Sequence, residues 1–170
     1  MRLLLNIGLC LIFLSCMKKN NIEPVKNFDL NNYLGLWYEI ARLPNSFEKG
    51  LEEITAEYFL NSDGTVKVVN SGFRADKDKR DYGFAKAWLV SDSTIGNLRV
   101  QFFWPFKAHY KIILLDEGYQ YAVVTGAGYN YLWILSRAPH MNELVLHQLI
   151  DTCTSWNFDT QKLIFPIHSL

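Results

Sequence analysis

The segment "GLWYEIARLPNSFEKG", residues 35–50, is the first strand-like run of the chain together with the loop that follows it. The run 35–43 opens on the pair Trp37 and Tyr38, and its composition is typical of a strand. A loop rich in turn residues then breaks the run and offers one aromatic, Phe47, to solvent. We therefore expect the fold to bury Trp37, and we expect the exposed Phe47 to have a functional role.

Seven more strand-like runs follow, and only the first connector, residues 44–53, is long. They span residues 54–61, 65–73, 83–90, 98–104, 109–115, 119–126 and 130–136. Consecutive antiparallel strands joined by tight turns form either a sandwich or an up-and-down barrel. Short connections between neighbours favour the barrel, and closure also removes the free sheet edges. We therefore expect an all-β fold, an eight-stranded antiparallel up-and-down barrel.

One C-terminal helix is expected to pack outside this barrel. Pro139 can occupy the first turn of a helix. Apolar residues then recur at spacings of three and four, which indicates one buried helix face: Met141, Leu144, Val145, Leu149 and Cys153. The final run, residues 162–167, is predicted to be a short strand that Pro166 confines to an edge or an end.

The first 15 residues have the pattern of a secretory signal, with Arg2 followed by an apolar stretch that is too short to span a membrane. The stretch "FLSC", residues 13–16, resembles the lipobox of bacterial lipoproteins and makes Cys16 the expected lipidated residue. The expected organisation is a signal peptide over 1–15, a lipidated tether over 16–27 and a barrel domain over 28–170. An ordinary cleaved signal and an uncleaved anchor are the alternatives.

Composition narrows the function further. The 170 residues suffice for one domain, and 17 basic residues balance 17 acidic ones. Because no basic stripe is present, no nucleic-acid partner is expected. Cys153 is the only cysteine left in the folded part, so no internal disulfide is expected, and a packed thiol is favoured over a nucleophile.

Alternation along the strands separates an apolar face from a polar one. Residues such as Glu57, Lys67 and Lys111 share the polar parity and should face solvent. The opposite parity should line the interior, as a pocket for a lipid with a polar end. The predicted ligand-binding residues on that face are Tyr58, Val68, Asn70, Phe84, Trp88, Val100, Phe102, Tyr110, Ile112, Val124, Tyr131 and Trp133. A core filled by these side chains, with no cavity, is the alternative.

The chain resembles the lipocalin family in an ordered set of features. These are Gly35 and Trp37 on the first strand, the long loop after that strand, and Arg137 at the end of the eighth strand. The wider string over residues 35–58 is similar to the bacterial outer-membrane lipoprotein branch of that family. The resemblance implies that Trp37 plugs the closed end of the barrel with Arg137 lying across it. It also implies that Phe47, on a loop overhanging the open end, contacts the ligand.

The sequence contains no nucleophile elbow, phosphate-binding loop or metalloprotease motif, and no metal site or cofactor is expected. The favoured hypothesis is a lipid-anchored protein of the outer membrane, facing the periplasm, that binds or carries fatty acids or lysophospholipids. An enzyme acting on such lipids inside the barrel is an alternative, and so is a carrier of another hydrophobic ligand, coloured ligands and haem included. Homodimerisation is left open.

Overall fold

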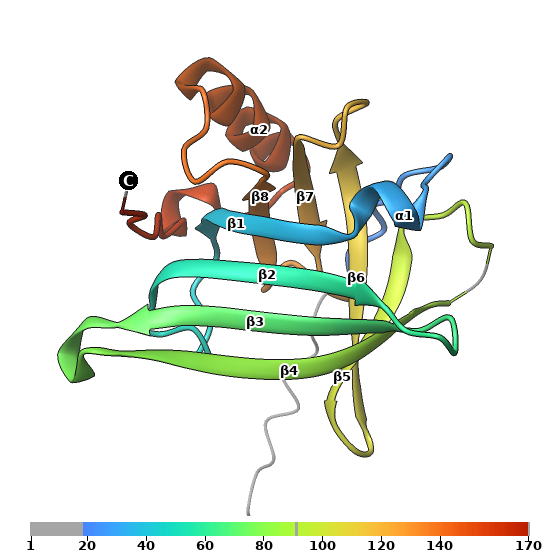
Figure 1. Cartoon of the computed structure of the whole chain (residues 1–170). Helices are drawn as coiled ribbons and strands as arrows, with labels where there is room; N and C mark the ends of the chain where they lie inside the picture. The colour runs from blue at the N-terminus through green and yellow to red at the C-terminus, as the bar shows by residue number, and fades with distance from the viewer. Residues whose placement is uncertain (1–18, 91, 170) are drawn as a thin grey trace, which may run out of the picture.

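The eight predicted strands form one closed antiparallel barrel in the computed structural model, which describes residues 19–90 and 92–169 (Figure 1). Each strand pairs with its neighbour in sequence, and β1 pairs with β8 to close the sheet. The expected fold class is confirmed. The strands are β1 Gly35–Arg42, β2 Glu52–Leu60, β3 Val66–Arg74, β4 Lys79–Leu89, β5 Asn97–Phe103, β6 Phe106–Leu115, β7 Tyr121–Thr125 and β8 Leu132–Ser136.

Up-and-down order gives the barrel two different ends. One end holds the start of β1 and the β2–β3, β4–β5 and β6–β7 turns. A short helix, α1 (Leu30–Tyr33), covers this closed end, and the Asp29 side chain caps it by accepting a hydrogen bond from the backbone N–H of Asn31 at 2.9 Å. The open end carries the β1–β2, β3–β4, β5–β6 and β7–β8 connections.

Two hairpins at the open end are longer than the sequence predicts. The predicted runs 65–73 and 83–90 leave residues 74–82 outside any strand, but only the 3₁₀ turn η1 (Ala75–Lys77) and Asp78 leave the sheet, and β4 already starts at Lys79. Pairing continues to the pair Arg74 and Lys79 because Asp78 adopts a left-handed conformation, with φ of 46°, that reverses the chain tightly. On β6 the strand begins at Phe106, three residues before the predicted start.

The C-terminal helix α2 (Glu143–Ser155) packs on the outer face of the barrel, as expected (Figure 1). It begins later than Pro139, because the Asn142 side chain caps it by accepting hydrogen bonds from the backbone N–H groups of Leu144 and Val145. Leu144 is exposed, so its place on the buried helix face was wrong. Cys153 is fully buried in this outer core, where burial raises the pKa of its thiol to about 12.

The segments that flank the barrel are hydrogen-bonded to it. After η2 (Thr160–Lys162), the predicted strand 162–167 forms a single bridge at Ile164, which exchanges backbone hydrogen bonds of 3.0 and 2.9 Å with Arg42. At the other end of the chain, Asn20 is buried against the β7–β8 connection. Within the described residues, no helix is long and apolar enough to cross a membrane.

Candidate ligand-binding interior

The closed end of the barrel is built around Trp37, which is fully buried. The guanidinium carbon of Arg137 lies 3.9 Å from the centre of its ring, and the indole N–H donates to the Tyr33 carbonyl at 2.8 Å. Arg137 also donates to the carbonyls of Leu36, Leu34 and Asn32 at 2.7, 2.9 and 2.8 Å. One cationic side chain thus ties the start of β1 to the end of β8.

Three tyrosine hydroxyls form a polar floor above this plug. The Tyr110 hydroxyl lies 2.7 Å from those of both Tyr33 and Tyr58, so it can donate to one and accept from the other. Burial raises the pKa of Tyr58 to about 12 and the pKa values of Tyr33 and Tyr110 well above their usual range. All three therefore stay neutral hydroxyls. Tyr58 and Tyr110 were among the predicted interior residues, whereas Tyr33 was not.

Apolar side chains from neighbouring strands surround the floor and form the inner core. The alanines of β4 belong to it, which leaves more room on that side of the barrel than aromatic rings would. Seven of the predicted residues belong to the inner core or pack against it: Tyr58, Val68, Val100, Tyr110, Ile112, Val124 and Trp133. Asn70 lies on the Val68 face of β3, nearer the open end, and is partly exposed.

An aromatic stack leads from the interior to the mouth of the barrel. The Tyr131 ring lies 5.8 Å from the Trp133 ring at an interplanar angle of 9°, and 6.2 Å from the Phe47 ring at 23°. Phe47 itself is 55% exposed. The indole N–H of Trp133 donates to the Glu48 carboxylate at 3.2 Å, which holds the β1–β2 loop over the interior. The structure thus brings Phe47, Tyr131 and Trp133 together.

The expected inward orientation was wrong for β4. Phe84 is 61% exposed, and Trp88 lies on the outer surface under the ammonium group of Lys107, 5.2 Å from its ring centre. The register pairs Ala85 with Val68, so the alanines face inward and the aromatics outward. Both parities of this strand contain apolar residues, so the larger side chains gave a misleading signal. Phe102 is also half exposed, at the open end next to a register shift.

A buried charged cluster, which the strand pattern did not predict, lies on β1 and the loop after it. Arg42 donates to Glu39 at 2.7 Å and approaches Glu48 at 3.7 Å, and the side chains of Arg42 and Glu39 are almost fully buried. A bulge between Glu39 and Ala41 places both residues on one face, opposite Leu135 and Trp133. Simple alternation hides this, because it assigns positions 39 and 42 to opposite faces.

The cluster is electrostatically unusual because two carboxylates share one guanidinium. Burial, followed by the neighbouring Glu48 carboxylate, raises the pKa of Glu39 to about 8, although Arg42 opposes the rise. Burial also raises the pKa of Glu48. Near neutral pH the cluster therefore keeps a proton on a carboxyl group that would be ionised in water.

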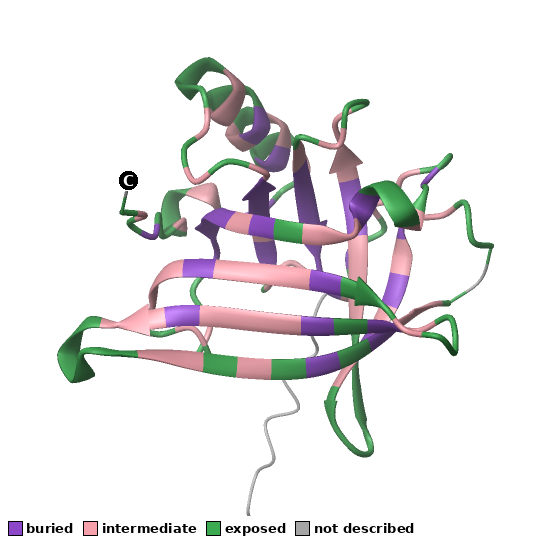
Figure 2. Ribbon diagram, in the orientation of Figure 1, coloured by how far each residue is buried: buried purple, intermediate pink, exposed green. Residues whose placement is uncertain are grey.

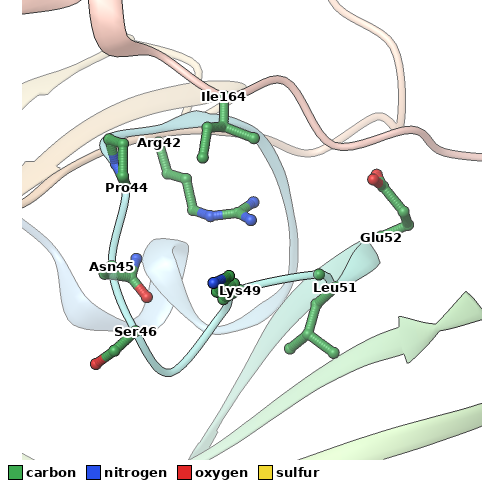
Figure 3. A pocket seen from close by; sticks show the side chains of 9 residues that line it. Arg42, Pro44, Asn45, Ser46, Lys49, Leu51, Glu52 and Ile164 are labelled. Atoms are coloured by element: carbon green, nitrogen blue, oxygen red, sulfur yellow. The ribbon is translucent and has the colours of Figure 1, made fainter. Parts of the chain in front are cut away.

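A cavity of about 420 Å³ opens beside this cluster, beneath the β1–β2 loop (Figure 3). The guanidinium of Arg42 points into it, and Pro44, Leu51 and Ile164 are among the residues on its wall. The loop, the start of β2 and the C-terminal segment therefore enclose a mainly apolar hollow with one buried cation at the open end. The cavity has room for part of a small amphipathic molecule.

A closed eight-stranded barrel with a plugged base and an apolar interior defines the class of small β-barrel proteins that bind hydrophobic ligands. Residues 28–168 match the family described as Lipocalin-like domain, and the chain belongs to the lipocalin family, in its bacterial outer-membrane lipoprotein branch.

Two curated relatives share the name outer membrane lipoprotein Blc. The Vibrio cholerae protein is 43% identical over 160 residues, covering 92% of this chain and 94% of the relative. The Escherichia coli K12 protein is 42% identical over 144 residues, covering 85% and 81%. Among solved structures, insecticyanin from the tobacco hornworm Manduca sexta superposes with a TM-score of 0.71 at 20% identity, covering 88% of this chain and 85% of that one, which supports the fold alone.

Proposed function

We propose that this lipocalin binds a single-chain lipid, a fatty acid or a lysophospholipid, while a lipid on Cys16 anchors it to the outer membrane. The outer-membrane localisation is supported by the relatives named outer membrane lipoprotein. Cys16 lies outside the described residues, so its lipidation rests on the lipobox-like sequence. We infer that the protein acts by binding and release rather than by catalysis, in keeping with the family.

The observation that carries the proposal is the graded interior. Apolar side chains surround the neutral tyrosine floor, and the aromatic stack and the buried Arg42 lie toward the mouth. An acyl chain that lies along the walls would place its polar head at the mouth, beside the aromatic stack. A free acyl chain that buries about ten methylenes gains roughly 8 kcal/mol from transfer. The entropic costs of association and ordering offset part of this gain, so the expected dissociation constant is roughly micromolar or somewhat lower.

Titration with palmitate and with lysophosphatidylethanolamine tests the proposal. Trp133 lies on the inner face and should report binding, so tryptophan fluorescence should change saturably. The fluorescence change should be lost in Trp133→Phe. Binding of lipid by this variant is measured separately, by retention of radiolabelled lipid. Turnover of the lysophospholipid by pure protein would overturn the inference of binding without catalysis.

Blocking variants locate the ligand. Val68→Arg puts a guanidinium into the wall opposite Tyr58. Asn70→Arg puts one into the same face nearer the mouth, where the long side chain can reach water without unfolding the barrel. Val69→Arg is the matched control, because Val69 pairs with the exposed Phe84 on the outer face. Wild-type binding by folded Val68→Arg and Asn70→Arg variants would exclude the barrel interior as the site.

A further inference from the structure

The β5–β6 hairpin ends in a cluster of exposed aromatic residues that no internal packing explains. Phe103, Trp104 and Phe106 are 66%, 85% and 67% exposed, and with Pro105 we call them the hairpin tip. The Phe103 and Phe106 rings lie 5.5 Å apart and shield each other only in part. Large apolar side chains seldom cluster in this way on the surface of a soluble protein. Such a patch marks a surface that binds a partner or a membrane.

The hairpin tip projects beyond the rest of the barrel wall. On the β7 side, regular pairing of β6 ends at Lys111, which lies opposite Thr125. Five more residues of β6 reach Phe106, a distance of about 17 Å at strand spacing. Figure 1 shows this hairpin extending away from the barrel, and Figure 2 shows its end as exposed. The aromatic tip is therefore placed to enter a surface that the open end approaches.

The N-terminal segment is fixed to the same end. Lys19 forms a bridge with Gly128 in the β7–β8 connection. Asn20 is only 1% exposed, and its side chain donates to the carbonyls of Gly128 and Gly126 at 3.0 and 3.2 Å. Lys111 donates to the Asn20 side chain from β6. The first described residues thus leave the barrel at its open end, beside the strand that carries the hairpin tip.

Covalent geometry links this attachment to the anchor. Lys19 is three residues after Cys16, and a fully extended chain spans at most about 3.6 Å per residue, or about 11 Å in total. A membrane that holds Cys16 must therefore lie close to the β7–β8 connection. It cannot lie against the closed end, because the barrel itself stands between.

We propose that the hairpin tip inserts into the phospholipid bilayer that holds Cys16, so that the open end of the barrel faces the membrane. This orientation rests on the proposed lipid anchor and deepens it. Aromatic side chains partition well into the interface of a bilayer. Lys107, next to the tip, and Lys19, at the anchored end, would meet anionic headgroups there. A single-chain lipid could then pass between barrel and bilayer without crossing water.

The test uses the full chain, native and as Cys16→Ser, with vesicles of phosphatidylethanolamine and phosphatidylglycerol that carry brominated acyl chains. Bromine quenches the fluorescence of tryptophans that lie at the depth of the acyl chains. Comparison with Trp104→Phe separates the fluorescence of Trp104 from that of the other four tryptophans. We expect strong quenching of Trp104 in the native protein. A triple variant, Phe103→Ser with Trp104→Ser and Phe106→Ser, should lower vesicle binding of the Cys16→Ser chain about tenfold.

Leu60→Ser is the matched control, because Leu60 is a half-exposed apolar residue at the closed end. If Trp104 is not quenched in vesicle-bound native protein, or if the triple variant binds vesicles as the Leu60 variant does, the orientation is wrong. Lysophospholipid titration separates this result from the proposed function. The triple variant should still bind lysophospholipid, and failure of the wild type to bind it would refute the ligand proposal without affecting the quenching result.

Discussion

Replacing Arg137 by alanine tests the closed end most directly. The substitution removes the cation that lies 3.9 Å from the centre of the Trp37 ring, together with hydrogen bonds to four backbone carbonyls, the fourth being that of Tyr119 at 3.3 Å. The cation–π contact contributes about 1 kcal/mol. Hydrogen bonds from a charged donor contribute about 1.5–3 kcal/mol each where the acceptor is buried.

Several of these acceptors can bind water once the guanidinium is gone, because the bonds to Leu36 and Asn32 lie in exposed surroundings. The bond to Tyr119 is also long. We therefore expect Arg137→Ala to lower the free energy of unfolding by about 3 kcal/mol in total, not the sum of all contacts. For a protein of this length that corresponds to a fall in Tm of roughly 6–12 °C.

Urea denaturation followed by circular dichroism measures this loss, with two comparisons. Arg137→Lys keeps a charge but not the forked donors, so it should recover only part of the stability. Arg74→Ala removes a partly exposed pair with Asp81 and should cost less than about 1 kcal/mol. If Arg137→Ala costs no more than Arg74→Ala, the assigned role of Arg137 is refuted.

Two further predictions concern the anchor and the buried charges. Cys16→Ser should leave a folded, exported protein that is largely recovered apart from the membrane, because the hairpin tip alone holds it only weakly, and full membrane retention of this variant would argue against lipidation. The pKa of Glu39 is raised from 4.5 to about 8, so between these pH values the native state keeps a proton that the unfolded chain loses. The free energy of unfolding should therefore fall as pH rises from 4.5 to about 8, by up to about 1.4 kcal/mol per pH unit. Glu39→Gln should flatten this slope in urea midpoints measured at pH 5, 7 and 9, and an unchanged slope would assign the effect to another group.

Strand number and order could be predicted from the sequence because they depend on local patterns. The eight runs are separated by short turn sequences, and nearest-neighbour pairing then follows from chain connectivity. Most interior positions follow from alternation where one parity is clearly polar, as on β2 and β6. Tyr58, Tyr110 and Ile112 were predicted in this way.

Alternation failed where its assumptions failed. On β4 the sequence "GFAKAWLV" (83–90) places apolar residues on both faces, and size suggested the wrong one. On β1 a one-residue bulge turned Arg42 toward the Trp133 face, which no local pattern reveals. Tyr33 joins the floor only because α1 folds across the barrel end. The attachment of Asn20 at the open end depends on a contact more than 100 residues away in sequence.

The buried cluster of Glu39, Arg42 and Glu48 is better explained by positioning than by stability. Removing two carboxyl groups and a guanidinium from water costs free energy that their mutual attraction only partly returns, and an apolar set of similar volume is often at least as stable. What these groups add is a fixed path for the loop. Arg42 donates to the Glu48 carbonyl at 3.0 Å, and the Glu48 carboxylate accepts from Trp133, so the residue next to Phe47 is joined to the barrel from two sides. The stack of Phe47 on Tyr131 then depends on charges beneath the loop, and a change at Arg42 should alter the mouth of the barrel before it unfolds the wall.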